Sequence, residues 1–157
     1  MFFILFISAT VYGIFLYVDL VEQRTKAHEQ TERALLEQTA LEQVEKIENF
    51  HGEEPYHVVY GRNEQGTEQL IFYPLEGTEK TLTIVDMDEI LPESAMIGMW
   101  QTECDGCEFV KITPALLDDK ILWELVYYDA ENRYVLDYRS IYDGTPYEQL
   151  SFASRFK

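Results

Sequence analysis

The chain has 157 residues, which allows one domain, or two very small ones, beyond any targeting segment. Its hydrophobic share of 46% excludes disorder by composition. A formal net charge of -17 excludes nucleic acid as a partner, because phosphate groups would be repelled, and argues against adhesion of the folded part to an anionic surface. Two cysteines are too few for a disulfide framework, so the fold must depend on its own core.

The chain begins with an uncharged apolar run over residues 2–18, FFILFISATVYGIFLYV. As a helix this run would span about 26 Å, just short of a hydrocarbon core about 30 Å thick. A cleaved signal peptide would have a shorter apolar run and a small-x-small site after it, and no such site follows. We therefore expect a retained transmembrane helix over residues 1–18. Its flanking charges do not place the following domain outside, because Arg24 and Lys26 come after the run.

A long helix is predicted over residues 22–49, which contain no Gly or Pro and are rich in Ala, Leu, Glu, Gln and Lys. The first half of this helix is polar all round, so residues 19–35 are predicted to form a helical stalk. The second part has an apolar stripe that must pack on something. The stripe consists of Leu36, Ala40, Val44 and Ile47. Gly52 offers the C-terminal stop.

Seven strands are predicted after this helix from short runs rich in aromatic and β-branched residues. The runs are 56–60, 70–73, 81–85, 109–113, 121–128, 134–141 and a weaker one at 150–152. Polar segments at 62–69 and 129–132 read as hairpin loops, and 142–146 reads as a turn. A second, short helix is predicted after Pro92, with Glu93 in its first turn. Its apolar face is formed by Ala95, Met96, Met99 and Trp100.

An internal repeat is predicted because the sequence resembles itself when it is shifted by 67 positions. Tyr56 then lies on Trp123, and Gly77-Thr78 lies on Gly144-Thr145. The match runs through strand, loop, strand and turn without a gap, although the predicted helices do not align at this shift. We expect an α+β fold of two tandem units, each a helix packed on an antiparallel sheet. Residues 36–87 form the first predicted unit and residues 88–157 the second.

The sharpest local motif is Cys104-Asp105-Gly106-Cys107. A redox-active dithiol would need a low thiol pKa, but acidic neighbours raise it. A zinc site would need four ligands, and the motif supplies two. We therefore expect a local disulfide that stiffens a turn, with the redox and metal readings as the alternatives.

No catalytic motif and no cofactor site is recognisable, so we expect a protein that is not an enzyme and uses no cofactor or metal. The carboxylates are expected to be solvated, although the group of Asp86, Asp88 and Glu89 offers a weak calcium alternative. The same reading holds for Asp118 and Asp119. The three histidines, His28, His51 and His57, are expected to be packing or surface residues.

The second predicted unit is rich in tyrosine. Strand alternation sends Tyr134, Leu136 and Tyr138 to one face, which we expect to be the core, and Val135, Asp137 and Arg139 to the other. Tyr128 and Tyr147 are left over and are candidates for a protein-binding surface, where tyrosine is enriched. A sheet edge or a cleft between the repeats would be the docking feature.

Three parts of the sequence resemble the TseB-like (YpmB) family: the apolar start, EQVEKIENFHGEEPYHVVYG at 42–61, and ILWELVYYDAENRYVLDYRSIYDG at 121–144. The resemblance implies tandem PepSY-like, cystatin-like units behind one transmembrane helix. The turn at Tyr142-Asp143-Gly144-Thr145 departs from the Asp-x-x-Thr-Gly pattern of PepSY-like units, which puts any ligand role of that turn in doubt.

The resemblance also implies a function and a location. We expect a cell-membrane protein with an extracytoplasmic C-terminal domain that regulates cell wall elongation by contact with a penicillin-binding transpeptidase. Two alternatives stay open. One is an inhibitor or chaperone of an exported protease, and the other is an envelope thiol-redox protein that uses Cys104 and Cys107.

Overall fold

The computed structural model describes the backbone of residues 2–52, 54–77 and 80–153, and the side chains of these stretches from residue 11 onward. The chain divides into two compact parts, residues 1–41 and residues 42–157. The first part is helical, and the second contains two four-stranded sheets and one helix.

Helix α1 runs without interruption from Phe2 to Gln38. The side chains of residues 1–10, more than half of the predicted membrane anchor, lie outside those that the structure describes. Among the described residues, no helix is long and apolar enough to cross a membrane. The structure therefore gives no support to the anchor predicted over residues 1–18.

The prediction of a helix up to residue 49 is wrong, because α1 ends eleven residues earlier and Leu41–His51 form strand β1. Thr39 explains the end of the helix. Its hydroxyl donates to the Leu35 carbonyl at 2.7 Å and accepts the Leu41 N–H at 3.2 Å. A threonine that bonds the backbone in this way offers an alternative to the helical ladder. The apolar spacing of three in Leu41, Val44, Ile47 and Phe50 imitates a helix, but β1 is paired beside β2.

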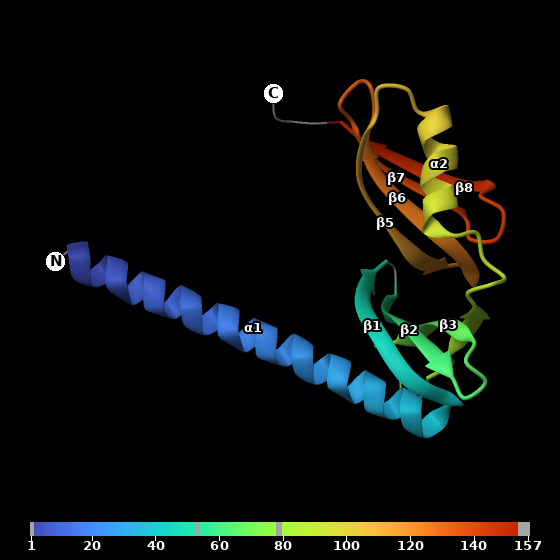
Figure 1. The fold of residues 1–157 in the computed structure, drawn as a ribbon. Coiled ribbons are helices and arrows are strands. Elements are labelled where there is room, and N and C mark those ends of the chain that lie inside the picture. Colours follow the sequence, from blue (N-terminus) through green and yellow to red (C-terminus); the bar gives the residue numbers. More distant parts are fainter. Residues whose placement is uncertain (1, 53, 78–79, 154–157) are drawn as a thin grey trace. The chain divides into compact units, whose positions relative to one another are not determined.

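The two sheets have the same strand order, β1-β2-β3-β4 and β5-β6-β7-β8 (Figure 1). The remaining strands are β2 (Pro55–Asn63), β3 (Glu68–Pro74), β4 (Thr83–Asp86), β5 (Glu108–Leu117), β6 (Lys120–Tyr128), β7 (Tyr134–Ser140) and β8 (Pro146–Phe152). Neighbouring strands from β2 to β4 and from β5 to β8 pair antiparallel. The seven strands predicted after residue 50 are all present, and their order confirms an α+β fold.

Helix α2 (Glu93–Glu103) follows Pro92 as predicted and covers one face of the second sheet (Figure 1). Met96 and Trp100 are buried, and the Trp100 ring lies 5.2 Å from the ring of Tyr127 on β6. Buried residues of both sheets form one hydrophobic core with the α2 residues. The connection before α2 is tied to the second sheet, because the Leu91 carbonyl accepts the indole N–H of Trp123 at 3.0 Å.

The predicted repeat exists, but the true shift is 66 residues and not 67. The two hairpins close with the same backbone bond, from the Asn63 N–H to the Thr67 carbonyl and from the Asp129 N–H to the Arg133 carbonyl, each at 3.0 Å. Strands β3 and β7 also begin and end 66 positions apart. At this shift α2 corresponds to residues 27–37 of α1, so the helices do align, contrary to expectation.

The one-residue difference matters because it moves every side chain to the opposite face of the sheet. Asp137 and Arg139 lie opposite Leu125 and Trp123 in the β6–β7 pairing, and so they share the face that α2 covers. The face that was not expected to be the core is therefore buried as well: Asp137 is 2% exposed and Arg139 is 7% exposed. The two charges tolerate burial because they pair with each other.

Candidate functional site

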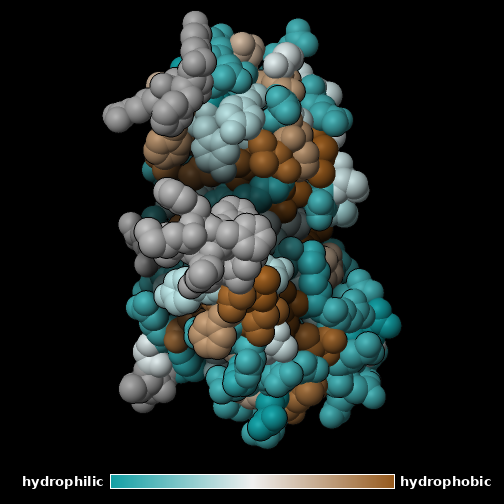
Figure 2. Space-filling view, turned by 90° about the vertical axis from the view of Figure 1, so that its left-hand side faces the viewer, coloured by the Kyte–Doolittle hydropathy of each residue, from teal (hydrophilic) through white to brown (hydrophobic). Residues whose placement is uncertain are grey.

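The most exposed apolar part of the second sheet lies on the face opposite α2, at the end where β6 turns into β7. We call it the open face and define it as Tyr128, Tyr134, Leu136, Leu150 and Phe152. These residues share one face because the pairing sets Tyr128 opposite Tyr134, Tyr134 opposite Phe152, and Leu136 opposite Leu150. Leu150 is 40% exposed and Phe152 is 51% exposed. Figure 2 shows apolar side chains gathered over this sheet, in the upper half of the view.

The two tyrosines of the open face pack against each other. The rings of Tyr128 and Tyr134 meet edge to face with 5.5 Å between their centroids. Aromatic pairs of this geometry contribute about 0.5–1.5 kcal/mol beyond the area that they bury. A preformed aromatic surface binds a partner with little loss of side-chain freedom, which is why tyrosine is common at protein interfaces.

A buried polar cluster lies beside the open face on the same side of the sheet. The Glu124 carboxylate accepts the Tyr138 hydroxyl at 2.7 Å, the Thr113 hydroxyl at 3.3 Å and the Lys111 ammonium at 3.1 Å. Burial, followed by the hydrogen bond to Glu124, raises the pKa of Tyr138 above its ordinary value. Both oxygens of Glu124 have partners inside the sheet, so this cluster has the character of a structural network and not of a catalytic acid or base.

The opposite face of the sheet holds a charged network under α2. Arg139 donates from Nε to Asp137 at 2.9 Å and from Nη1 to Glu103, at the end of α2, at 2.7 Å. Burial raises the pKa of Asp137, and the charge of Arg139 opposes that effect. The network links the last turn of α2 to the centre of β7.

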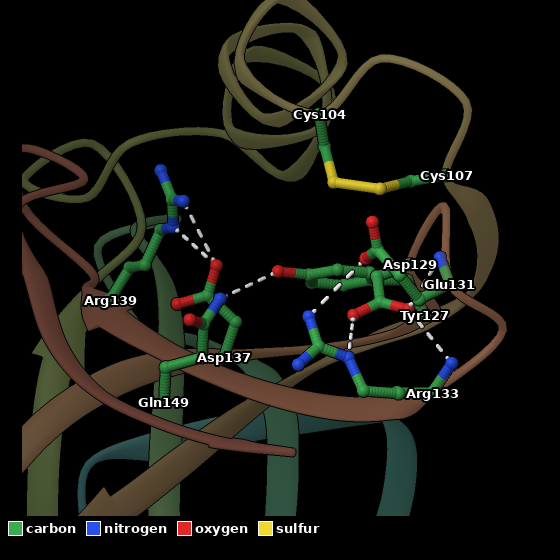
Figure 3. Close-up of a disulfide and its surroundings, with 9 residues drawn as sticks. All are labelled: Cys104, Cys107, Tyr127, Asp129, Glu131, Arg133, Asp137, Arg139 and Gln149. Carbon is green, nitrogen blue, oxygen red and sulfur yellow. Dashed lines mark hydrogen bonds and ion pairs between the residues drawn. A yellow bond between two sulfur atoms is a disulfide. The ribbon is translucent and has the colours of Figure 1, made fainter. Parts of the chain in front are cut away.

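Cys104 and Cys107 form a disulfide directly after α2 (Figure 3). The Cα atoms of the two cysteines are 5.6 Å apart. The bond lies at a hollow that the β6–β7 hairpin also lines, where Asp129 binds the backbone and the side chain of Arg133. Acidic residues surround it on both sides, which disfavours a reactive thiolate.

A cleft of about 450 Å³ lies where the first sheet meets the turn between β5 and β6. Tyr56 lies in it and donates its hydroxyl to Glu54 at 2.6 Å. Burial, with the Glu54 bond as the second cause, raises the pKa of Tyr56 to about 12. The other lining carboxylates are Glu76 and Asp119. The cleft is acidic, and the described residues that line it include no histidine, cysteine or serine for a nucleophile and its base.

The two tyrosines predicted to form a binding surface are not together. Tyr128 belongs to the open face, whereas Tyr147 lies at the other end of the sheet. There its hydroxyl donates to Asp118 at 2.7 Å, and the Lys120 ammonium lies 4.0 Å from its ring centroid. Tyr147 therefore helps to hold the β5–β6 turn.

Sequence reasoning missed Leu150 and Phe152 on the weakly predicted last strand. Tyr134 and Leu136, which were expected in the core, are half-buried, and Leu136 packs against the core. The alternation of Glu148, Leu150 and Phe152 was the available signal. His57 is buried in β2, and His51 is exposed at the end of β1. Among the residues with described side chains, no cluster of three or more His, Cys, Asp or Glu is arranged to hold a metal ion.

Fold and surface together define a class: an α+β protein of two tandem repeats with an apolar, partly exposed face on its second sheet. Residues 30–74, from the end of α1 to the end of β3, match the family model described as the cell wall elongation regulator TseB-like domain. The probable cell wall elongation regulator TseB of Bacillus subtilis (strain 168) is 26% identical over 135 residues, which cover 86% of this chain and 83% of that protein.

The solved structure of the YpmB protein from Bacillus subtilis is similar to this one with a TM-score of 0.71 at 25% identity, over 79% of this chain and 96% of that chain. The sequence match, the family model and the solved structure agree. All three comparisons support the TseB-like (YpmB) family of cell wall elongation regulators.

Proposed function

We propose that this protein is held in the cell membrane by residues 1–18 and regulates cell wall elongation outside the cytoplasm by contact with a penicillin-binding transpeptidase. The family supports the regulatory role, because its model and the Bacillus subtilis relative are both described as cell wall elongation regulators. The contact and the anchor are our additions to that role.

The observation that carries the proposed contact is the open face. It combines the exposed Leu150 and Phe152 with the half-buried Tyr128, Tyr134 and Leu136 on adjacent strands of one sheet, and its two tyrosines already meet edge to face. Apolar side chains clustered beside aromatic ones mark protein interaction sites. A regulator that acts by binding needs a surface for its partner, and the open face is the part of the second sheet best suited to bind a protein.

Two observations support the anchor and the extracytoplasmic side. The apolar run of residues 2–18 is uncharged and continues directly into the rest of α1, so one unbroken helix would connect the membrane to the domain. The Cys104–Cys107 disulfide fits an oxidising compartment, since disulfides are rare in the cytosol.

The contact is tested by photo-crosslinking in living cells. A photoreactive phenylalanine at Tyr128 is expected to form a crosslink to a transpeptidase, while the same residue at Ile84, an exposed position on β4, is the matched control and is expected to form none. A crosslink from Tyr128 to an exported protease in place of a transpeptidase would favour the inhibitor or chaperone alternative and overturn the proposal.

The orientation is tested separately by adding protease to intact protoplasts. The domain after residue 41 is expected to be degraded without lysis, because we propose that it lies outside. A C-terminal domain that survives until the protoplasts are lysed would refute the extracytoplasmic location.

A further inference from the structure

Strand β8 is the edge strand of the second sheet that has the least protection against pairing with another chain. Proteins protect edge strands with charges, bulges or very short length. Strand β1 carries Glu42, Glu45, Lys46 and Glu48, and β4 has only four residues. Strand β5 has a bulge between Phe109 and Lys111. The irregularity of β8 lies at its start, between Pro146 and Glu148, and from Glu148 to Phe152 every residue is exposed and the only charge is Glu148.

The register tells which backbone groups of β8 point outward. In the β6–β7 hairpin the Asp129 N–H donates to the Arg133 carbonyl, so these two residues form a hydrogen-bonded pair. Hydrogen-bonded and non-bonded pairs alternate along an antiparallel ladder, so the backbone groups of Val135 and Asp137 bond to β6. The intervening residues of β7, Leu136 among them, therefore bond toward β8. Their partners are Glu148, Leu150 and Phe152. The N–H and carbonyl groups of Gln149 and Ser151 consequently point away from the sheet.

We propose that this outer edge of β8 binds an extended, basic segment of a partner protein as a fifth strand of the second sheet. Main-chain hydrogen bonds to Gln149 and Ser151 supply part of the affinity, as in other cases of strand addition. Alternate apolar side chains of the incoming strand extend the open face beside Leu150 and Phe152. The proposal deepens the proposed function and rests on it for the statement that the partner is an envelope protein.

Charge selects this occupant over a second copy of the chain. Two copies would each bring a net charge of -17 and would repel one another. An antiparallel pair of β8 strands would also bring two Glu148 side chains to the same interface. A segment with lysine or arginine beside Glu148 gains from the same field, both in its rate of encounter and in the final contact.

The test uses the full chain in mild detergent and a short capped peptide in which valine alternates with lysine or threonine. The peptide is expected to bind saturably, and hydrogen exchange is expected to slow at the Gln149 and Ser151 amides. A matched peptide with glutamate in place of lysine is expected to bind at least about ten-fold more weakly, because like charges at an interface cost several kcal/mol. Equal binding of the two peptides would overturn the charge selection.

Two further controls isolate the edge. Ser151→Pro removes one outward N–H and is expected to weaken binding about ten-fold or more, since the bond and the close approach are both lost, while Ser151→Ala keeps the N–H and stays within about two-fold. Should Ser151→Pro misfold, methylating the amides on one side of the peptide asks the same question without changing the protein. Methylation on the pairing side abolishes binding, and methylation on the other side leaves it.

Slowed exchange at β1, β4 or β5 in place of β8 would overturn the proposal, as would the absence of saturable binding. Concentration-dependent self-association that protects β8 would also overturn it, because the occupant would then be a second copy. Peptide binding at β8 without a crosslink from Tyr128 to a transpeptidase would leave the edge site in place and remove the proposed function. A crosslink from Tyr128 to a transpeptidase without peptide binding at β8 would leave the proposed function in place and remove the edge site.

Discussion

Removing the guanidinium of Arg139 is expected to destabilise the fold severely. Arg139 is 7% exposed and is the partner of Asp137, which is 2% exposed under α2. In Arg139→Met the apolar part of the side chain is kept, but the Asp137 carboxylate remains buried without a counter-charge. Glu103, the other partner of Arg139, has a side chain that is 52% exposed, so water can solvate it and its loss costs little.

The expected cost of Arg139→Met is about 3–5 kcal/mol, the range found when one member of a buried ion pair is removed. That is a large fraction of a total stability of about 5–15 kcal/mol. The double variant Asp137→Ile, Arg139→Met is expected to be as stable as the parent or more so, because replacing a buried pair by apolar residues is often neutral or stabilising. Isoleucine is chosen because Ile71, 66 positions earlier, is fully buried in the first sheet.

Urea unfolding followed by tryptophan fluorescence measures both variants. A loss of 3–5 kcal/mol lowers the midpoint by more than about 1 M for a slope of about 1–3 kcal/mol per M. If the double variant were as unstable as Arg139→Met, the uncompensated charge would not be the cause of the loss. The charged network would then be needed for packing, and the reasoning would be refuted.

Three further predictions concern the second repeat. Burial raises the pKa of Asp137, so the folded state holds this proton more tightly than the unfolded chain. The group's stabilising contribution is full at low pH and is lost as pH rises through the folded pKa. The urea midpoint of Asp137→Asn relative to the parent should therefore improve as pH rises above the ordinary carboxyl pKa, and a flat difference would contradict the shift. Gly144→Ala should lower the free energy of unfolding by about 1–2 kcal/mol, because Gly144 has φ of 75° and an added Cβ would lie 2.8 Å from Met99 Cε. Gly98→Ala in the middle of α2 meets open space and should raise it by about 0.5–1 kcal/mol. Thermal unfolding measures both variants, and a change of the same sign in both would refute this argument. Cys104→Ser should lower the unfolding free energy by about 2 kcal/mol through loss of a short closed loop and leave wall elongation unchanged, and a lost phenotype at unchanged stability would favour the thiol-redox alternative.

The sequence predicted the seven strands after residue 50 well, but it predicted a helix where β1 lies, and both results have physical causes. The runs at 56–60 and 121–128 contain β-branched and aromatic residues between turn residues, so local preference and sheet pairing agree. In β1, Leu41, Val44 and Ile47 keep a helical spacing among good helix formers, and pairing beside β2 overrides that preference. Only the threonine after Gln38 marked the change, and threonine is too common in helices to be read as a stop.

The candidate site was predictable in kind but not in place. Tyrosine enrichment pointed to a binding surface, and Tyr128 does lie on the open face. The core assignment on β7 holds for Tyr138, but the opposite face is buried as well, because an alternating strand carries apolar residues on both sides and the sequence does not show that Asp137 and Arg139 find partners. Aligning the hairpins at Gly66 and Asn132, both of which have positive φ, would have given the shift of 66 and the correct faces.

The ion pair of Asp137 and Arg139 has a further consequence for how the chain avoids misfolding. Two repeats with the same strand order risk exchanging strands while they fold, and such misassembly is a common failure of repeated domains. A β7 strand that paired with β2 in place of β3 would put Asp137 opposite Val59 and Arg139 opposite His57, and so would take Arg139 away from Glu103. In the exchanged sheet the two charges would stay paired with each other, but Arg139 would lose its hydrogen bond to Glu103, so this bond to the end of α2 favours β7 in its own repeat.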